Sequence, residues 1–178
     1  MRPPMKQGSP DDYQTPPQAL RPLLPFLKKD WTIWEPAAGS GYLADKLEQL
    51  GFGVIATDKF YDKEDVAWDF LTDKPPYWDC IITNPPFSKK QQFLQRCYEL
   101  GTPFALLLPL TTFETAKRQN LFKEHGLEVI FFDKRVNFET PNKIANSSSW
   151  FATAWFTWGL NIGKELTFVK YEDSPTLL

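Results

Sequence analysis

Short apolar runs typical of β-strands alternate with longer amphipathic runs typical of helices along most of this 178-residue chain. The expected strands cover residues 31–34, 53–57, 66–70, 78–83, 103–108, 127–132 and 151–158, and the expected helices cover 42–50, 89–100 and 113–125. Strands joined by helices of this length run mainly parallel, because each crossover returns the chain in the same direction. The pattern predicts an α/β fold of three layers, with a mostly parallel seven-stranded sheet between helices. The last two runs are expected to form an antiparallel hairpin at the sheet edge.

Length and composition favour a single folded domain. A chain of 178 residues with 42% hydrophobic residues can bury one good core but not two. Residues 1–12 are rich in proline and polar side chains and are expected to be disordered, so the predicted domain spans residues 13–178. The polar stretch 137–149 is expected to be a mobile loop. Cys80 and Cys97 are too few for a metal quartet or a disulfide framework, and we expect two buried thiols and no metal site.

The charge balance limits the possible partners. A net charge of −2 and a pI of about 5.5 exclude a global basic field of the kind that attracts nucleic acid, so any such contact must be local. No run has the length and apolar character of a signal peptide or a membrane span. We therefore expect a cytoplasmic protein without a membrane partner.

The stretch Asn84-Pro85-Pro86-Phe87 directly follows the apolar run 80–83. Two consecutive prolines remove two backbone donors and stiffen the loop, so its carbonyls stay unpaired. Asn84 then presents an amide oxygen beside a free backbone carbonyl, and Phe87 adds a flat aromatic face. Two acceptors and a stacking ring suit a planar ring that carries an exocyclic amino group. Taken alone, the stretch fits a simple Pro-Pro turn at a strand end equally well.

A glycine turn lies between the first expected strand and the first expected helix. Gly39, Gly41 and Ala44 form a G-x-G-x-x-A pattern, which lets a ligand approach the backbone closely. A tight strand-to-helix turn explains this pattern equally well. Glu35 precedes the glycines, and Asp58 follows the next strand, where an acidic side chain suits ribose hydroxyls.

The glycine turn and the acid would also fit a nicotinamide-dependent dehydrogenase. Such an enzyme needs an acid or a base at the hydride site, and the only histidine is His125 at an expected helix end. We interpret His125 as a surface or capping residue, which disfavours the dehydrogenase.

Together and in this order, the motifs resemble the class I S-adenosylmethionine-dependent methyltransferases. The Asn-Pro-Pro-Phe stretch is similar to the (D/N/S)-P-P-(Y/F/W) motif of the DNA adenine-N6 branch. The motifs run from about Tyr13 to Phe87, and the strand pattern extends the resemblance to Trp158. The resemblance implies a Rossmann-like methyltransferase fold, S-adenosylmethionine as the cofactor, and methyl transfer to adenine N6 without a metal.

The resemblance also implies roles for individual residues. The segment 13–17 would close over the methionine end of the cofactor, Asp58 would bind its ribose, and the pair Asp69-Phe70 would hold its adenine. The implied cofactor-binding residues are Tyr13, Thr15, Pro16, Glu35, Pro36, Ala37, Gly39, Gly41, Asp58, Lys59, Asp69, Phe70 and Asn84. The implied catalytic residues are Asn84, Pro85, Pro86 and Phe87. In this mechanism the Asn84 oxygen and the Pro85 carbonyl accept both N–H bonds of the amine while Phe87 stacks on the base.

The substrate is less constrained than the cofactor. No segment is large enough for a target-recognition region, and the candidate substrate-binding residues are Lys89, Lys90, Arg135 and Lys143. A solvated helix face and an ordinary surface loop are equally good interpretations of these cations. DNA is the expected substrate, with RNA bases and protein glutamine amides as alternatives. A recognition subunit, a homodimer, or a role as a cofactor-binding subunit without its own catalysis also remain open.

Overall fold

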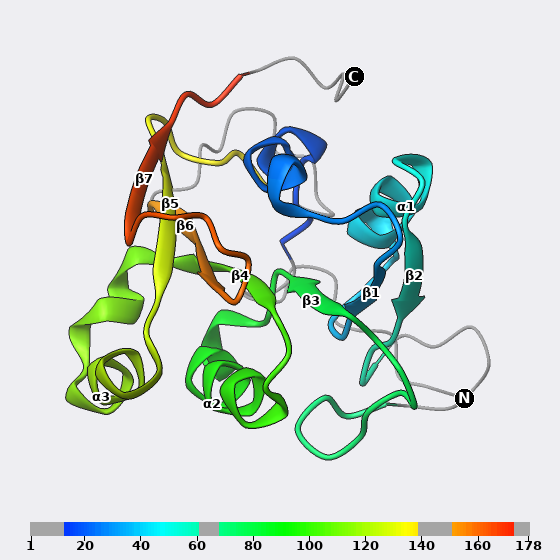
Figure 1. The fold of residues 1–178 in the computed structure, drawn as a ribbon, viewed down its shortest axis with the longest axis horizontal. Coiled ribbons are helices and arrows are strands. Elements are labelled where there is room, and N and C mark those ends of the chain that lie inside the picture. Colours follow the sequence, from blue (N-terminus) through cyan, green and yellow to red (C-terminus); the bar gives the residue numbers. More distant parts are fainter. Residues whose placement is uncertain (1–12, 61–67, 139–150, 173–178) are drawn as a thin grey trace.

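The computed structural model describes residues 13–60, 68–138 and 151–172 (Figure 1). Within these residues seven strands form one sheet in the order β2-β1-β3-β4-β6-β5-β7. The strands are β1 (Thr32–Glu35), β2 (Gly53–Ala56), β3 (Cys80–Thr83), β4 (Phe104–Pro109), β5 (Glu128–Phe132), β6 (Thr153–Trp158) and β7 (Leu166–Val169). The α-helices are α1 (Tyr42–Gln49), α2 (Lys90–Leu100) and α3 (Ala116–His125), and the 3-10 helices are η1 (Pro17–Phe26), η2 (Phe87–Lys89) and η3 (Leu110–Glu114).

The sheet is mostly parallel, as expected. The strands β2, β1, β3 and β4 pair in parallel, and β5 pairs in parallel with β7. The strand β6 is reversed, and it pairs antiparallel with β4 on one side and β5 on the other. The expected antiparallel pair of β5 and β6 is thus confirmed, but it does not lie at the edge, because β7 forms the last strand.

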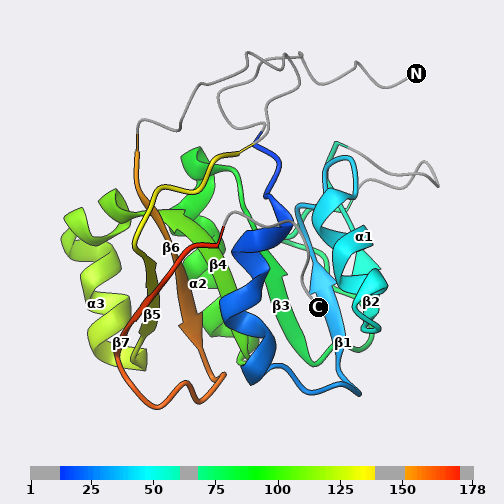
Figure 2. The same cartoon turned by 90° about the horizontal axis from the view of Figure 1, so that it is seen from above.

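Helices cover both faces of the sheet, so the molecule has three layers (Figures 1 and 2). Alternate residues of each strand point to opposite faces. Ile33, for example, packs into the core beneath η1 and α1, whereas its neighbour Trp34 packs into the core beneath α2. The most apolar strand, β4, is buried along its whole length because it lies in the middle of the sheet.

The helix η1, drawn in blue in Figure 2, was not expected from the sequence. Pro22 and Pro25 lie inside it and lack the N–H groups that an α-helix needs, so the segment resembles a loop in sequence. It buries Ala19, Leu20 and Leu23 against the sheet. The indole N–H of Trp155 donates to the Ala19 carbonyl at 2.6 Å, which joins η1 to β6.

Three further expectations need correction. The strand expected over 66–70 is not present in its described part, because residues 68–70 lead into a turn that Asp69 caps. The third helix begins at Ala116 with Thr115 as its N-cap, and η3 precedes it. The edge strand β7 was not expected.

Some expectations lie outside the described residues. These are the disorder of residues 1–12 and almost all of the loop expected over 137–149. Both cysteines are free and buried, as expected. Across the described ranges, no helix has the length and apolar character needed to cross a bilayer.

Candidate active site

The chemically active side chains gather where three neighbouring parallel strands end. Glu35 is the last residue of β1, Asp58 follows β2 by two residues, and Asn84 directly follows β3. The three strands are adjacent in the order β2-β1-β3, so their carboxyl ends lie side by side at the carboxyl end of the sheet. Ligands of open α/β sheets bind beyond this end.

Glu35 carries a buried carboxyl at the end of β1, the middle one of these three strands, and 1% of its surface is exposed. Its Oε1 accepts hydrogen bonds from the Thr83 hydroxyl and from the Ala37 N–H. Burial raises the pKa of Glu35 to about 8, and the negative charge of Asp58 adds to the effect, although the two hydrogen bonds oppose it. The bond from Thr83 connects the strand before the glycine turn to the strand before the Asn84 loop.

The glycine turn is held by Asp58. Its Oδ2 accepts the Gly39 N–H at 2.9 Å, and its Oδ1 accepts the Phe60 N–H at 2.7 Å. Gly39 and Gly41 have φ values of +53° and +90°, which glycine adopts at little cost. Asp58 therefore fixes the turn that precedes α1.

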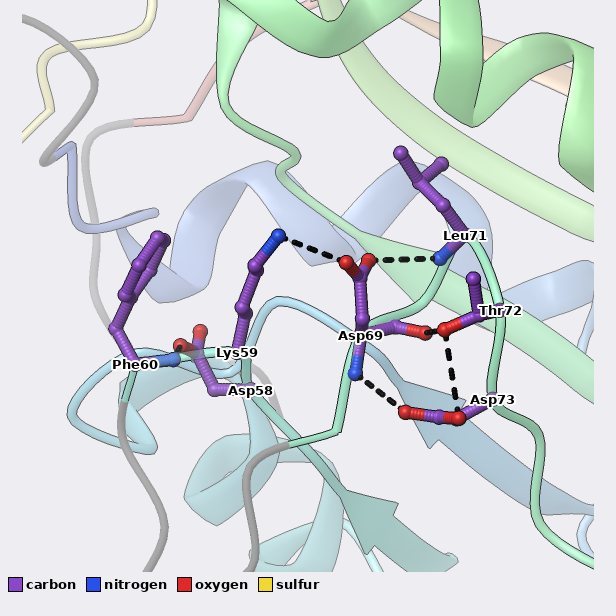
Figure 3. Close-up of polar contacts among 7 residues, drawn as sticks. All are labelled: Asp58, Lys59, Phe60, Asp69, Leu71, Thr72 and Asp73. Carbon is purple, nitrogen blue, oxygen red and sulfur yellow. Dashed lines mark hydrogen bonds and ion pairs between the residues drawn. The ribbon is translucent and has the colours of Figure 1, made fainter.

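Asp69 and Lys59 form an ion pair beside this turn, with 2.8 Å between Nζ and Oδ2 (Figure 3). The hydrogen bond from Lys59 lowers the pKa of Asp69, and the Leu71 N–H also contributes to this decrease. Asp73 accepts the N–H of Asp69, so the turn orients the carboxylate. In Figure 3 the Phe60 ring lies on the side of Lys59 opposite Asp69, and Phe60 is 58% exposed.

Phe70, the second residue of the pair implied to hold the adenine, is buried. It is 3% exposed and packs edge-on against Trp34 and stacks on Phe93, with a centroid distance of 4.6 Å to the latter. Its ring therefore belongs to the core beneath α2. The role of the pair Asp69-Phe70 in holding the cofactor adenine stays a prediction.

Asn84 is oriented by the backbone of the N-terminal segment. Its Nδ2 donates to the Tyr13 carbonyl at 2.9 Å. Its Oδ1 is buried and accepts no hydrogen bond within the part of the chain that the structure describes. A buried acceptor without a partner costs about 1–3 kcal/mol, so this oxygen suits a donor that a ligand brings.

The loop after Asn84 is braced on both sides. Pro85 is buried, and no hydrogen bond reaches its carbonyl among the described residues. The Pro86 carbonyl accepts the Lys89 N–H at 2.9 Å, and the Lys90 ammonium donates to the Phe87 carbonyl at 3.3 Å. The Pro85 carbonyl is thus open to a donor from a ligand, and its role as the second acceptor beside Asn84 stays a prediction.

Four aromatic rings from distant parts of the chain meet at this loop. Tyr13 stacks on Phe87 at 5.8 Å between centroids and 21° between planes. Phe138 and Phe151 contact both of these rings and each other, with centroid distances between 5.4 and 6.3 Å. We call Tyr13, Phe87, Phe138 and Phe151 the aromatic cluster. It surrounds the loop with apolar surface.

The N-terminal segment reaches both parts of the site. Tyr13 contacts the Asn84 loop, and the Gln14 side-chain oxygen accepts a hydrogen bond from the Ser40 hydroxyl in the glycine turn at 3.1 Å. Thr15 and Pro16 are buried beneath these contacts. The structure therefore brings segment 13–16, the glycine turn and the Asn84 loop together.

Of the four predicted substrate-binding cations, the three in the described part of the chain do not form one cluster with the other site residues. Lys89 is exposed and lies near enough to Asp69 to lower its pKa. Lys90 braces the loop, and Arg135 is exposed beyond β5. Lys143 lies outside the described residues.

Several residues of this site were not predicted from the sequence. Thr83 is a polar residue at the end of an apolar strand, and that position was an available signal. Gln14 lies inside the segment that was singled out, but its contact to Ser40 needs the tertiary structure. Phe138 and Phe151 carried no signal, because only the folded chain brings them beside Phe87.

The arrangement combines a buried carboxyl at a glycine turn with two free acceptors and an apolar ring cluster. Among the described residues no group of His, Cys, Asp and Glu side chains could hold a metal ion. The site is suited to binding a polar ligand along the turn and to orienting an amine at Asn84.

Comparison with known structures confirms the expected fold, which is that of the class I S-adenosylmethionine-dependent methyltransferases. A proposed class I methyltransferase from Listeria monocytogenes superposes with a TM-score of 0.60 at 15% identity, over 94% of this chain and 68% of that one. An S-adenosylmethionine-dependent methyltransferase from Archaeoglobus fulgidus gives a TM-score of 0.50 at 11% identity, over 79% of this chain and 90% of that one. No protein-family model matches the sequence, and no curated protein is similar to it.

Proposed function

We propose that this protein transfers a methyl group from S-adenosylmethionine to the N6 amine of adenine in nucleic acid, and we favour DNA as the substrate. The observation that carries the proposal is the buried Oδ1 of Asn84, which accepts no hydrogen bond among the described residues and belongs to the same loop as Phe87. The fold shared with methyltransferases supports methyl transfer in general.

The residues present fit this cofactor. The turn at Gly39 and Gly41 would admit its methionine part, Glu35 would lie near its positive charges, and Asp58 would face its ribose. Lys59 and Asp69, which form an ion pair, would border its adenine. When bound, S-adenosylmethionine supplies an electrophilic methyl group on a sulfonium.

The chain's own contribution is orientation and charge stabilisation. Asn84 Oδ1 and the Pro85 carbonyl accept the two N–H bonds of the target amine, which favours a pyramidal nitrogen with an available lone pair. As positive charge develops on that nitrogen, the two fixed dipoles stabilise it. The aromatic cluster excludes water and offers a stacking surface to the base.

The test is incubation of the purified protein with methyl-labelled S-adenosylmethionine and, separately, duplex DNA, single-stranded DNA, RNA and cell protein. We expect N6-methyladenine in DNA. Asn84→Ala should abolish transfer and largely preserve cofactor binding, whereas Asn120→Ala, at an exposed position of α3, should change neither. Full activity of Asn84→Ala would contradict the proposed mechanism.

Other outcomes of this test would redirect the proposal. Label only in RNA bases or in glutamine amides would retain the mechanism and change the substrate. Cofactor binding without any label would favour a subunit that needs a recognition partner or a second copy. A net charge of −2 supports such a partner or a single-stranded substrate, because few cations are available for phosphates.

A further inference from the structure

We propose that Tyr13 is a positioning residue that determines which end of the Asn84 amide faces the substrate. The inference rests on the proposed function, because it assigns a requirement of that same site. The backbone carbonyl of Tyr13 accepts a hydrogen bond from the Asn84 amide and so orients it. The Tyr13 ring packs against Phe87 and so keeps that carbonyl in place.

The Asn84 amide has two ends with opposite roles. Its nitrogen only donates hydrogen bonds and its oxygen only accepts them. A backbone carbonyl only accepts, so the Tyr13 carbonyl at 2.9 Å must face Nδ2. Oδ1 is then directed away from Tyr13 and is buried without a partner among the described residues. If the amide rotated by half a turn, a donor would face the N–H bonds of the target amine and would oppose its binding.

The Tyr13 carbonyl is held in place by its own side chain. The Tyr13 ring contacts all three other rings of the aromatic cluster, and the nearest-to-parallel contact is with Phe87. Phe87 lies three residues after Asn84, so the ring and the carbonyl of Tyr13 grip the same loop. Gln14 adds a hydrogen bond from Ser40, which fixes the next residue against the glycine turn.

A substitution of Tyr13 by Phe keeps the ring and the carbonyl, whereas Ala removes the ring that anchors the carbonyl. We expect Tyr13→Ala to reduce kcat by about tenfold, the loss that corresponds to one orienting hydrogen bond. Tyr13→Phe should stay within about twofold of the natural protein. Tyr77→Ala serves as the matched control, because Tyr77 is 60% exposed and lies outside the site.

The decisive comparison uses Asn84→Asp, which puts oxygen at both ends of the side chain and removes the choice of orientation. If Tyr13 acts by orienting the amide, Tyr13→Ala should lower kcat by a smaller factor in the Asn84→Asp background than in the background that keeps Asn84. The two factors should differ at least several-fold. Equal losses in both backgrounds would show that Tyr13 only supports the fold, and would overturn the proposal. Where Asn84→Asp transfers no methyl group, the following measurement decides.

A readout independent of activity is the solvent exchange of the Asn84 side-chain amide hydrogens in the full ¹⁵N-labelled chain, with Asn84→Ala identifying the signal. Slow exchange in the natural protein and Tyr13→Phe, with exchange about tenfold faster in Tyr13→Ala, supports the orienting bond. Equally fast exchange in all three refutes it, even if DNA is methylated. Slow exchange without methylation of any substrate refutes the proposed function and leaves the role of Tyr13 intact.

Discussion

Glu35 is a residue of the candidate site whose acid-base chemistry the fold changes strongly. Its carboxyl lies between the ends of β1 and β3, where water is excluded and Thr83 donates to it. Burial raises its pKa to about 8, so the carboxyl is mostly protonated at neutral pH. A buried neutral acid beside a site proposed for a cation is a group that can ionise on binding.

The first prediction concerns stability and pH. Above a pH of 4.5 the unfolded chain loses the Glu35 proton, while the native state keeps it until about 8, so the native state binds more protons in this window. Its contribution to stability is therefore complete at low pH and is lost as the pH rises. Glu35→Gln should remove this decrease, which is on the order of a few kcal/mol.

Urea unfolding of both proteins between pH 5 and 8 measures this effect. The exposed Glu48→Gln on α1 is the control and should show the natural slope. If the free energy of unfolding of Glu35→Gln falls with pH as steeply as that of the natural protein, another group is responsible for the decrease.

The second prediction concerns cofactor binding. A bound cation favours the ionised Glu35, so binding should release a proton, and affinity should increase with pH by up to about tenfold per unit toward pH 8. Glu35→Gln should bind more weakly at pH 8 and show little pH dependence. Calorimetry in buffers of different ionisation enthalpy measures the proton release, and its absence in the natural protein would contradict this role of Glu35.

At the scale of elements, η1 is the part of the structure that most needs tertiary contacts. A 3-10 helix of 10 residues with internal prolines is unfavourable by itself, because its hydrogen bonds are few and poorly aligned. Its stability must come from the burial of one face, to which Ala19, Leu20 and Leu23 contribute.

The third prediction tests this burial. Leu20→Ala should lower the free energy of unfolding by about 2–5 kcal/mol, because Leu20 is fully buried. Leu166→Ala on β7 makes the same chemical change at a position that is 52% exposed, and it should cost about 0.5 kcal/mol or less. Similar losses in both variants, measured by denaturant unfolding, would mean that η1 contributes little.

The central strands and helices were predictable because their patterns are local. β3 and β4 carry apolar runs, β1 carries the apolar pair Ile33-Trp34, and α2 has the amphipathic period of a helix. The failures have physical causes: η1 is hidden by its prolines, and β7 is a short edge strand with two exposed apolar residues, Leu166 and Phe168. The strand expected near Trp68 gave way to the turn that Asp69 caps.

The site was predictable to a similar extent. Glu35, Asp58 and Asn84 lie at strand ends because polar residues follow apolar runs there, and that order is visible in the chain. The burial of the Phe70 ring was not predictable, because its partner Phe93 lies on a helix whose packing the sequence does not reveal. The aromatic cluster also depended on contacts between distant segments.

For the molecule as a whole, the small negative charge means that the proposed nucleic-acid binding would depend on a few local cations. We expect oligonucleotide affinity to decrease only shallowly with salt, and Lys89→Gln to reduce the slope of log K against log salt by about one. Lys164→Gln, at an exposed position before β7, should leave the slope unchanged. An unchanged slope in Lys89→Gln, measured by fluorescence anisotropy, would remove Lys89 from the proposed interface.

The contact between η1 and β6 also bears on how the protein is made. The ribosome synthesises η1 before its partner, because the indole that binds the Ala19 carbonyl belongs to Trp155, which is 136 residues later. Arg21 of η1 likewise pairs with Glu172, beyond β7. During translation this part of the chain must therefore wait for these two contacts, and chaperones have a long interval in which to bind it. A nascent chain stalled before β6 would carry the Asn84 loop and the first strands, but it would lack the indole that joins η1 to β6.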